Sequence, residues 1–315
     1  MSTTDTQTMR AVLTTGDAQS PLRVERAPVP SPAAGEVLVR VHATSLNAGE
    51  LRRAAASPAG NRIGWDFAGA VERAAADGSG PPAGARVVGF ADSVAWADYV
   101  ISVPSQLGVV PDSVTFDDAA TLPVAGLTAL RALRHRGDLR GKRVLLAPGN
   151  GGVGLFGIQL ARMFGAEGTA VVRRTVAAVV AAGPTRIVVG TTADASRHGP
   201  YDVILDSLGG PSLAASLASV AEDGIVVNFG NSMGTATTFD PPSFFRIGGA
   251  SLYGFILFHE AEKEPVGRDL EELAGYVASG TLSTNVDATY DLDCIGDAVE
   301  AWRNRTITGK VVVRF

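Results

Sequence analysis

The sequence predicts an α/β protein built around a parallel sheet, and three observations support this prediction. Between residues 143 and 230, short apolar runs such as VLLA and VILD alternate with Ala-rich stretches of helical composition. A glycine-rich turn, PGNGGVG, follows the first of these runs and precedes a long apolar stretch. Before residue 110, short apolar runs are separated by Gly, Pro and Ser, which is typical of β-rich structure. Strands that alternate with helices need right-handed crossovers, so they form a parallel sheet with helices on both faces.

Length and composition fit a folded protein of two domains. Of the 315 residues, 46% are hydrophobic and 19% are charged, close to the average for globular proteins. The net charge of −5 argues against a nucleic-acid partner, because binding to phosphates needs a basic surface. No apolar run approaches the roughly 18 residues of a membrane-spanning helix, so we expect no membrane partner.

Cysteine and histidine usage argues against a disulfide and against a metal site. Cys294 is the only cysteine, so the chain cannot form an internal disulfide, and it suits a reducing compartment. The four histidines are scattered, with no pair at ligand spacing. The N-terminus lacks the basic-then-apolar order of a secretory signal. We therefore expect a cytoplasmic protein without a bound metal.

The first part of the chain is expected to form strands and then to become helical. In the segment EVLVRVHATSL, the valines at 37, 39 and 41 alternate with the residues at 38, 40 and 42, as in a half-buried strand. Proline-rich breaks at 28–32 and 80–82 fit turns between strands. From residue 115 the pattern becomes helical, with a kink expected at Pro123.

The glycine turn has the pattern and the context of a dinucleotide-binding motif. Gly149, Gly151 and Gly154 match G-x-G-x-x-G between a predicted strand at 144–147 and a predicted helix at 153–164. The first glycine permits the tight turn, the second lets backbone amides approach a pyrophosphate, and the third lets the helix pack against the sheet. The helix N-terminus favours the phosphates. The alternative is a glycine-rich turn with no ligand. The predicted cofactor contacts here are Gly149, Asn150, Gly151, Gly152, Val153 and Gly154.

The end of the next strand predicts which cofactor is bound. An NAD site usually has Asp or Glu there, but this chain has AVVRRT, with Arg174 twenty positions after Gly154. Two guanidinium groups suit the 2′-phosphate of NADPH, whereas Glu167 is expected to lie before the strand and to point away. We therefore predict NADPH rather than NADH as the cofactor. The alternative is that Arg173 and Arg174 are a solvated surface pair.

With these features in place, the chain resembles the medium-chain dehydrogenase/reductase superfamily, in its zinc-independent quinone-oxidoreductase (zeta-crystallin-like) branch. The resemblance extends from Met9 to Phe315, and it implies a Rossmann doubly wound parallel sheet inserted in a GroES-like β-rich domain. The implied domains are a GroES-like catalytic domain from 1–122 and 258–315 and a Rossmann NADPH-binding domain from 123–257. It also implies a cleft that holds nicotinamide and substrate, and a homodimer formed by Rossmann edges. The segments that carry it are SLNAGELRR, IGWDFAGAVE, WADYVISVP, AATLPVAGLTALRAL, PGNGGVG, YDVILDSLGG and TGKVVVRF.

Comparison with zinc-dependent members predicts the chemistry. Those members have a cysteine ahead of the position of Asn47 and a His-Glu pair after the glycine that matches Gly64, where this chain has Trp65-Asp66. Without soft or imidazole ligands, zinc-assisted alcohol oxidation is not expected. The predicted reaction is hydride transfer from NADPH to an acceptor that is already electrophilic, either a quinone or an α,β-unsaturated carbonyl.

Three residues are predicted at the catalytic site. Asn47 would contact the nicotinamide ribose or the substrate oxygen, or it would instead complete a turn before a helix at 49–53. Arg52 would bind a carbonyl or an anionic substrate tail, or be a solvated helix residue. Trp65 would wall the acceptor pocket or fill the core. Nearby, Glu50 is expected to be a helix-start carboxylate.

Further cofactor contacts follow from the resemblance and from the carboxyl ends of the predicted strands. Thr128 resembles a residue that contacts nicotinamide, although helix packing would also explain it. The end of the GIVVNFG strand is expected beside the cofactor. The full set of these contacts is Thr128, Ser207, Phe229, Gly230, Phe255 and Lys310.

Two departures from the family pattern leave alternatives open. The crossover at 190–202 is too short for a full helix, and the loop at 54–62 is short, which would admit a bulky substrate. One alternative is therefore a dedicated biosynthetic tailoring reductase that acts on a bulky intermediate. The other is a non-catalytic NADPH-binding protein.

Overall fold

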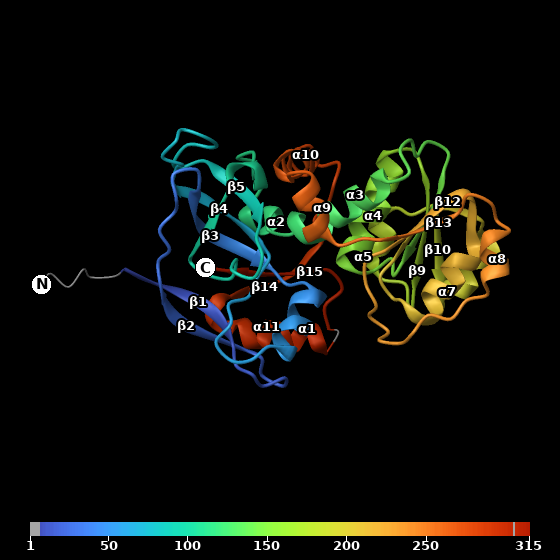
Figure 1. Cartoon of the computed structure of the whole chain (residues 1–315), viewed down its shortest axis with the longest axis horizontal. Coiled ribbons are helices and arrows are strands. Elements are labelled where there is room, and N and C mark those ends of the chain that lie inside the picture. Colours follow the sequence, from blue (N-terminus) through green and yellow to red (C-terminus); the bar gives the residue numbers. More distant parts are fainter. Residues whose placement is uncertain (1–6, 305) are drawn as a thin grey trace, which may run out of the picture. The chain divides into compact units, whose positions relative to one another are not determined.

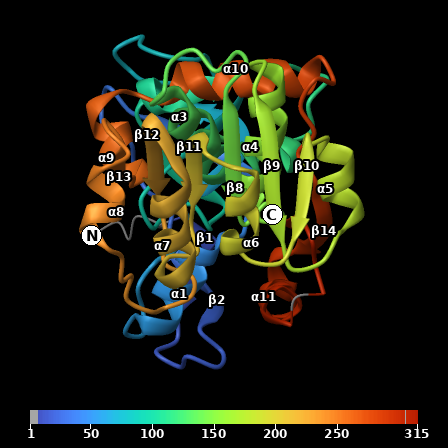
Figure 2. The same cartoon turned by 90° about the vertical axis from the view of Figure 1, so that its right-hand side faces the viewer.

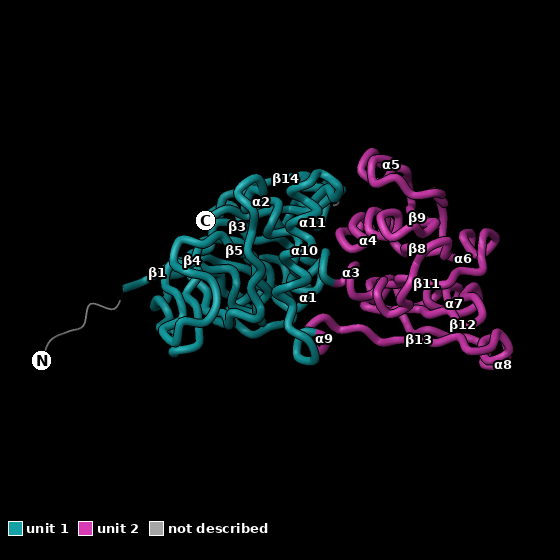
Figure 3. Tube along the Cα trace, turned by 90° about the horizontal axis from the view of Figure 1, so that it is seen from above, with its two compact units in different colours: residues 1–127, 261–315 teal, residues 128–260 magenta. Residues whose placement is uncertain are grey.

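The computed structural model describes residues 7–304 and 306–315, which fold into two compact units (Figure 3). One unit combines Met1–Leu127 with Ala261–Phe315, and the other is Thr128–Glu260. The sequence placed these divisions after residues 122 and 257. The first division falls instead at the start of helix α3 (Leu127–Arg134), and the second falls within helix α9 (Leu257–Lys263).

The unit formed by both chain ends is β-rich (Figure 1). Its described strands form a hairpin of β1 (Thr8–Thr14) and β2 (Leu22–Pro28), and a sheet of order β14-β15-β3-β4-β5-β7 in which β6 also pairs with β3. The remaining bounds are β3 (Val37–Ser45), β4 (Asp66–Arg73), β5 (Arg86–Phe90), β6 (Tyr99–Ser102), β7 (Leu107–Val109), β14 (Val286–Asp291) and β15 (Lys310–Arg314). Antiparallel pairing of β15 with β3, with Val313 opposite Thr44, joins the last strand of the chain to an early one.

Helices and an apolar core complete this unit. The predicted alternation in β3 holds except at Leu38, which is buried together with Val37, Val39 and Val41. The stretch around Pro123 forms a π-helical turn, Leu122–Gly126, where the sequence predicted a kink. The described helices are α1 (Ala48–Ala56), α2 (Phe116–Ala119), α10 (Gly267–Ala278) and α11 (Ile295–Arg303), besides the part of α9 that belongs to this unit.

The second unit, in which every residue is described, holds a parallel sheet of order β10-β9-β8-β11-β12-β13. Figure 2 shows β12, β11, β8, β9 and β10 side by side. The order reverses at β8, as in a Rossmann fold. The strands are β8 (Arg143–Ala147), β9 (Glu167–Val172), β10 (Arg186–Val189), β11 (Tyr201–Asp206), β12 (Val220–Asn228) and β13 (Ser251–Gly254). The helices after α3 are α4 (Gly152–Met163), α5 (Ala177–Ala182), α6 (Thr192–Ala195), α7 (Gly210–Ser219) and α8 (Pro241–Phe245).

One element bound in this unit differs from the sequence-based expectation. Glu167 is the first residue of β9, not a residue before it, because it pairs with Arg143 of β8. Helix α7 ends at Ser219, because Val220 already pairs with Tyr201 of β11. The crossover at 190–202 is short, as expected, with α6 and one 3-10 turn, Ser196–His198.

The fold is therefore α/β, with a parallel Rossmann-type sheet inserted between two parts of a β-rich unit. Within the described residues, no helix combines the length and apolar character needed to cross a bilayer.

Candidate active site and cofactor-binding residues

Helix α1 begins at a capping arrangement centred on Glu50. Asn47 is the N-cap residue, and both its backbone N and its Nδ2 donate to Glu50 Oε2, at 2.9 Å each. The other carboxylate oxygen, Oε1, accepts from the backbone N of Trp65 at 2.5 Å. Glu50 thus joins the start of the helix to the segment before β4, which agrees with the helix-start role expected for it.

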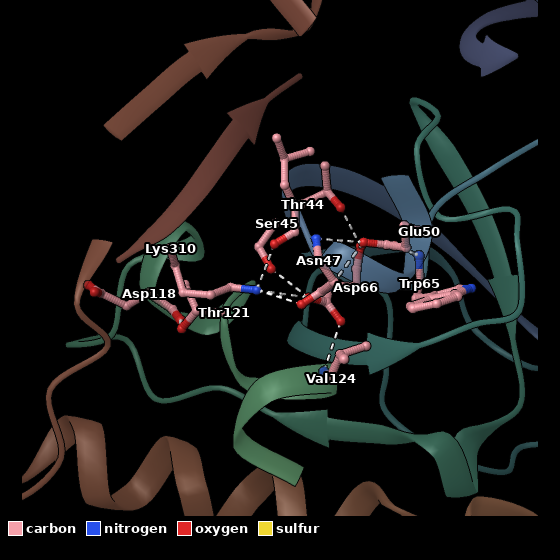
Figure 4. Close-up of polar contacts among 11 residues, drawn as sticks. Thr44, Ser45, Asn47, Glu50, Trp65, Asp66, Asp118, Thr121, Val124 and Lys310 are labelled. Atoms are coloured by element: carbon pink, nitrogen blue, oxygen red, sulfur yellow. Dashed lines mark hydrogen bonds and ion pairs between the residues drawn. The ribbon is translucent and has the colours of Figure 1, made fainter. Parts of the chain in front are cut away.

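Asn47 is held in place by a buried network of charges (Figure 4). Its Nδ2 also donates to Asp66 Oδ2 at 2.8 Å, and its Oδ1 accepts from Lys310 Nζ at 2.7 Å. Lys310 Nζ donates to the carbonyl of Leu46 at 3.1 Å and lies 3.7 Å from Asp66 Oδ2. Both amide hydrogens of Asn47 are therefore used within the protein, and one lone pair of Oδ1 is left to accept another hydrogen bond.

Asp66 is the carboxylate of this network that pairs with the Lys310 ammonium. Its Oδ1 accepts from Val124 N at 2.9 Å, and its Oδ2 accepts from the hydroxyl of Ser45 as well as from Asn47. Its backbone carbonyl accepts from the hydroxyl of Thr44. Asp66 and Glu50 are fully buried and Lys310 is 4% exposed, so the network holds two carboxylates and one ammonium away from water.

Burial shifts the ionisation of all three groups. It raises the pKa of Glu50 well above its usual range, and the nearby Asp66 carboxylate adds to that rise. Burial also raises the pKa of Asp66, against the opposing effect of Lys310. Burial lowers the pKa of Lys310, although both carboxylates favour its charged form. Two carboxylates facing one ammonium favour retention of a proton in the network.

The other two predicted catalytic residues differ in their surroundings. Trp65 is half-buried, and its ring lies so close to Gly49 that a Cβ there would come within 2.7 Å of Trp65 Cη2. Arg52 is exposed on α1. The structure therefore brings Asn47 and Trp65 together through Glu50, and it leaves Arg52 outside this network.

In the second unit, the predicted glycine turn joins β8 to α4. A Cβ on Gly149 would lie 2.6 Å from Ala170 Cβ, and a Cβ on Gly154 would lie 2.2 Å from the Pro148 carbonyl oxygen. At Gly151, the N-cap of α4, the nearest atom to a Cβ would be Pro148 Cγ at 3.7 Å. Close packing explains why Gly149 and Gly154 are glycines. Gly151 instead leaves open space at a helix N-terminus, which fits the close approach of a phosphate group.

The two predicted arginines follow β9. Arg173 and Arg174 are both exposed, and neither has an ion pair among the residues that the structure describes. Two guanidinium groups without a carboxylate partner fit the binding of an anionic ligand.

The carboxyl ends of β11 and β12 hold three more predicted contacts. Ser207 N donates to the carbonyl of Ala147 at 3.0 Å, which places it beside the start of the glycine turn. Phe229 N donates to the carbonyl of Asp206 at 3.0 Å, and a Cβ on Gly230 would lie 3.0 Å from the Ser207 carbonyl oxygen. The structure thus brings Ser207, Phe229 and Gly230 together at one edge of the sheet.

The remaining predicted contacts are buried. Thr128, in α3, is 5% exposed, and Phe255, after β13, is 2% exposed. Lys310 lies in the network around Asn47, where its ammonium already has protein acceptors. The roles of Asp66 and Asp206 in organising these sites were not predicted from the sequence. In both cases the signal was an acidic residue at a strand terminus: Asp66 begins β4 and Asp206 ends β11.

Among the residues that the structure describes, the side chains do not fit a zinc ion. The residues described contain no group of three or more His, Cys, Asp or Glu side chains that could hold a metal. Cys294 is exposed, and the buried carboxylates Glu50 and Asp66 face N–H donors and the Lys310 ammonium. Positively charged and N–H groups repel a cation, so no step of the reaction is assigned to zinc.

Comparison with known families agrees with this architecture. The model of the alcohol dehydrogenase GroES-like domain matches residues 33–125, and the model named zinc-binding dehydrogenase matches residues 177–313. The chain belongs to the medium-chain dehydrogenase/reductase superfamily, and it is an oxidoreductase of that superfamily.

Individual relatives cover nearly the whole chain. A probable zinc-binding oxidoreductase, mitochondrial, from Arthroderma benhamiae is 27% identical over 93% of this chain and 92% of its own length. Quinone oxidoreductase-like protein 2 from Mus musculus is 26% identical over 96% and 91%. A solved mycobacterial structure complexed with NADPH has a TM-score of 0.83 and 26% identity, and the match covers 98% of this chain and 100% of that one.

A further relative is much longer. The chain is 31% identical to part of a highly reducing polyketide synthase from Arthrinium phaeospermum, over 92% of this chain but only 13% of that protein.

Proposed function

We propose that this oxidoreductase is a zinc-independent reductase that uses NADPH to reduce a quinone or an α,β-unsaturated carbonyl. The observation that carries the proposal is the open glycine turn before α4, followed one strand later by two exposed arginines without an ion pair among the described residues. An extra phosphate on the adenine ribose explains why two cations, and no carboxylate, follow β9.

The second unit contains the groups that would hold the cofactor. The N–H of Gly149 already donates to the Val171 carbonyl at 2.7 Å, so the backbone N–H groups of the turn from Asn150 to Val153 would bind the diphosphate at the N-terminus of α4. Arg173 and Arg174 would bind the 2′-phosphate with charged hydrogen bonds. Bound NADPH supplies a hydride, and the protein supplies position and a dry environment.

Within the first unit, the hydrogen bonds of Asn47 favour one of the two contacts proposed for it, the nicotinamide ribose or the substrate oxygen. Its two amide hydrogens already bind Glu50 and Asp66, so it is a poor donor to a substrate oxygen. Its Oδ1 retains one lone pair, which suits a hydroxyl donor such as that of the nicotinamide ribose. We therefore favour the ribose contact over the substrate contact.

The acceptor must be electrophilic by itself if no metal polarises it. Quinones and enones meet this requirement, and the likeness to a mouse quinone oxidoreductase-like protein supports them. The likeness to part of a highly reducing polyketide synthase favours a second candidate, a tailoring reductase that acts on an unsaturated acyl intermediate.

We also propose a homodimer that functions in the cytoplasm. Strand β13 lies at one edge of the parallel sheet, and Leu252 within it and Ile256 just after it are 47% and 62% exposed. An exposed apolar sheet edge favours pairing with a second copy. The exposed free thiol of Cys294 suits a reducing compartment. Light scattering of Leu252→Glu tests the dimer, with Val180→Glu, on exposed α5, as the control.

An acceptor assay tests the proposed reaction. NADPH absorbance is followed with 1,4-benzoquinone, 9,10-phenanthrenequinone, a simple enone and an α,β-unsaturated acyl thioester. We expect turnover with the quinones and the enone. Turnover with the thioester alone would select the tailoring candidate, and tight NADPH binding without turnover on any acceptor would refute the reductase.

A further inference from the structure

The second unit contains a buried carboxylate that the proposed reaction does not use. Asp206, the last residue of β11, is fully buried. Among the described residues, no lysine, arginine or histidine lies within ion-pair distance of it. Burying a carboxylate without a cation costs folding free energy unless several hydrogen-bond donors satisfy it. The donors around Asp206 therefore show what this carboxylate organises.

Neutral donors from the start of α7 satisfy Asp206. Its Oδ1 accepts from Gly209 N at 2.8 Å, and its Oδ2 accepts from Ser212 Oγ at 2.6 Å and from Ser216 Oγ at 3.4 Å. The N-terminus of α7 also favours a negative charge at this place. These bonds fix the turn at 207–210, which joins β11 to α7.

The same residue fixes the loop that follows β12. Asn228 Nδ2 donates to the Asp206 carbonyl at 3.2 Å and lies 3.4 Å from Asp206 Oδ1. The loop then bonds to the turn directly, because Ser232 N donates to the Ser207 carbonyl at 3.0 Å and Met233 N donates to the Leu208 carbonyl at 2.9 Å. The turn and the loop form one hydrogen-bonded body around Asp206.

This body extends to the shortened crossover. The hydroxyls of Thr192, in α6, and Ser212 are 2.6 Å apart, and both residues are buried. A series of hydrogen-bonded polar groups therefore connects Thr192, Ser212 and Asp206, which are buried, to Asn228, which is half-buried. The hydrogen bond between Thr192 and Ser212 thus attaches the short crossover to α7, in place of the packing that a longer crossover helix would provide.

The strand order indicates which half of a dinucleotide would lie next to the turn and the loop around Asp206. The glycine turn follows β8, and the two arginines follow β9 on one side of it. A dinucleotide spans the point where the strand order reverses, so the half opposite to the arginines lies over β11 and β12. The turn at 207–210 and the loop at 228–235 lie at the carboxyl ends of those two strands.

We infer that Asp206 is a positioning residue that, through Ser212 and Asn228, holds Ser207, Phe229 and Gly230 against the nicotinamide half of the cofactor. This inference rests on the proposed use of NADPH. Asp206 itself touches neither cofactor nor substrate in this account.

Calorimetric titration of the full chain with two ligands tests the inference. NADPH carries both halves of the dinucleotide, whereas 2′,5′-ADP carries only the half assigned to the glycine turn and the arginines. The variants are Asp206→Asn and Ser212→Ala. Ser219→Ala is the matched control, because Ser219 is a buried serine of the same helix that bonds to Ala215 O and not to Asp206.

We expect both variants to raise the Kd for NADPH about tenfold, because Ser212→Ala removes the hydroxyl that binds Asp206 and Thr192, and Asp206→Asn replaces a charged acceptor with a neutral amide. The Kd for 2′,5′-ADP and both Kd values of the control are expected to stay unchanged. If Ser212→Ala binds NADPH as tightly as the wild-type protein does, the inference is overturned. It is also overturned if the affinities for NADPH and for 2′,5′-ADP fall equally, because that result indicates general damage to the unit. If Asp206→Asn does not fold, Ser212→Ala decides the question. Failure of the wild-type protein to bind NADPH would instead overturn the proposed function, and the inference with it.

Discussion

The two units each bury carboxylates, but they balance them in different ways. In the β-rich unit, the Lys310 ammonium pairs with Asp66 and also favours the charged form of Glu50 nearby. Pairing of β15 with β3 brings this ammonium from the far end of the chain. In the Rossmann-type unit, Asp206 is satisfied by backbone, hydroxyl and amide donors that lie three to 22 residues away in sequence. The first centre depends on a distant charge, whereas the second depends on local neutral groups.

This difference predicts unequal sensitivity to substitution. Removing the partner of a buried charge leaves that charge uncompensated, which costs more than weakening one of several neutral hydrogen bonds. Substitutions in the two units test this contrast.

Lys310→Met is expected to have the largest effect on stability. It leaves two buried carboxylates without their ammonium, and we expect it to lower the free energy of unfolding by about 3–5 kcal/mol. Denaturant titration of the folded protein measures this change. The control is Arg40→Met, which breaks the Arg40–Glu72 pair, whose side chains are 52% and 39% exposed, and which is expected to change stability by less than about 1 kcal/mol. An equal effect of both variants would contradict the account of the Lys310 network.

Asp206→Asn is expected to have a smaller effect on stability. The asparagine keeps the acceptor for Gly209 N, and the hydroxyl of Ser212 can rotate to accept from the new amide, so we expect a loss of about 1–2 kcal/mol. The same denaturant titration applies. A loss as large as that of Lys310→Met would show that the second centre also depends on its charge.

Glu50→Gln is expected to change the pH dependence of stability. Because the pKa of Glu50 is raised in the folded state, the folded protein binds a proton that the unfolded chain releases, and stability falls as pH rises from about 4.5 through the raised pKa. The variant removes this contribution, so we expect its unfolding free energy to fall less steeply over that range. Parallel profiles for wild type and variant would show that Glu50 titrates normally.

Gly151→Ala is expected to have the smallest effect on stability. No atom lies closer than 3.7 Å to the added Cβ, so we expect a change within about 0.5 kcal/mol. The methyl group would nevertheless fill the space assigned to the diphosphate, and the Kd for NADPH is expected to rise at least about tenfold. The matched control is Gly168→Ala in β9, which also has open space around its Cβ. Unchanged NADPH affinity in Gly151→Ala would contradict the placement of the phosphates.

Much of the fold could be predicted from the sequence because its signals are local. The strand before the glycine turn, the turn itself and the helix after it are contiguous, and the structure places them as β8, the turn and α4. The helix start at Glu50 is local in the same way, since Asn47 and Glu50 lie three positions apart.

The buried networks could not be predicted, because they arise from tertiary pairing. Nothing near Lys310 in the sequence shows that it meets Asn47, 263 positions away. The sequence identified Asp206 only as part of a strand, because its partner Asn228 follows a helix and belongs to another strand. That both amide hydrogens of Asn47 are used within the protein was likewise visible only after Asp66 was placed.

The most direct test of the account compares the Kd of NADPH with that of NADH for the wild-type protein and for an Arg173→Ala/Arg174→Ala double variant. We expect the wild-type protein to bind NADPH at least about tenfold more tightly than NADH, and the double variant to lose that preference while its Kd for NADH stays within about twofold. Equal affinities in the wild-type protein, or tighter binding of NADH, would contradict the central claim that these arginines bind a 2′-phosphate.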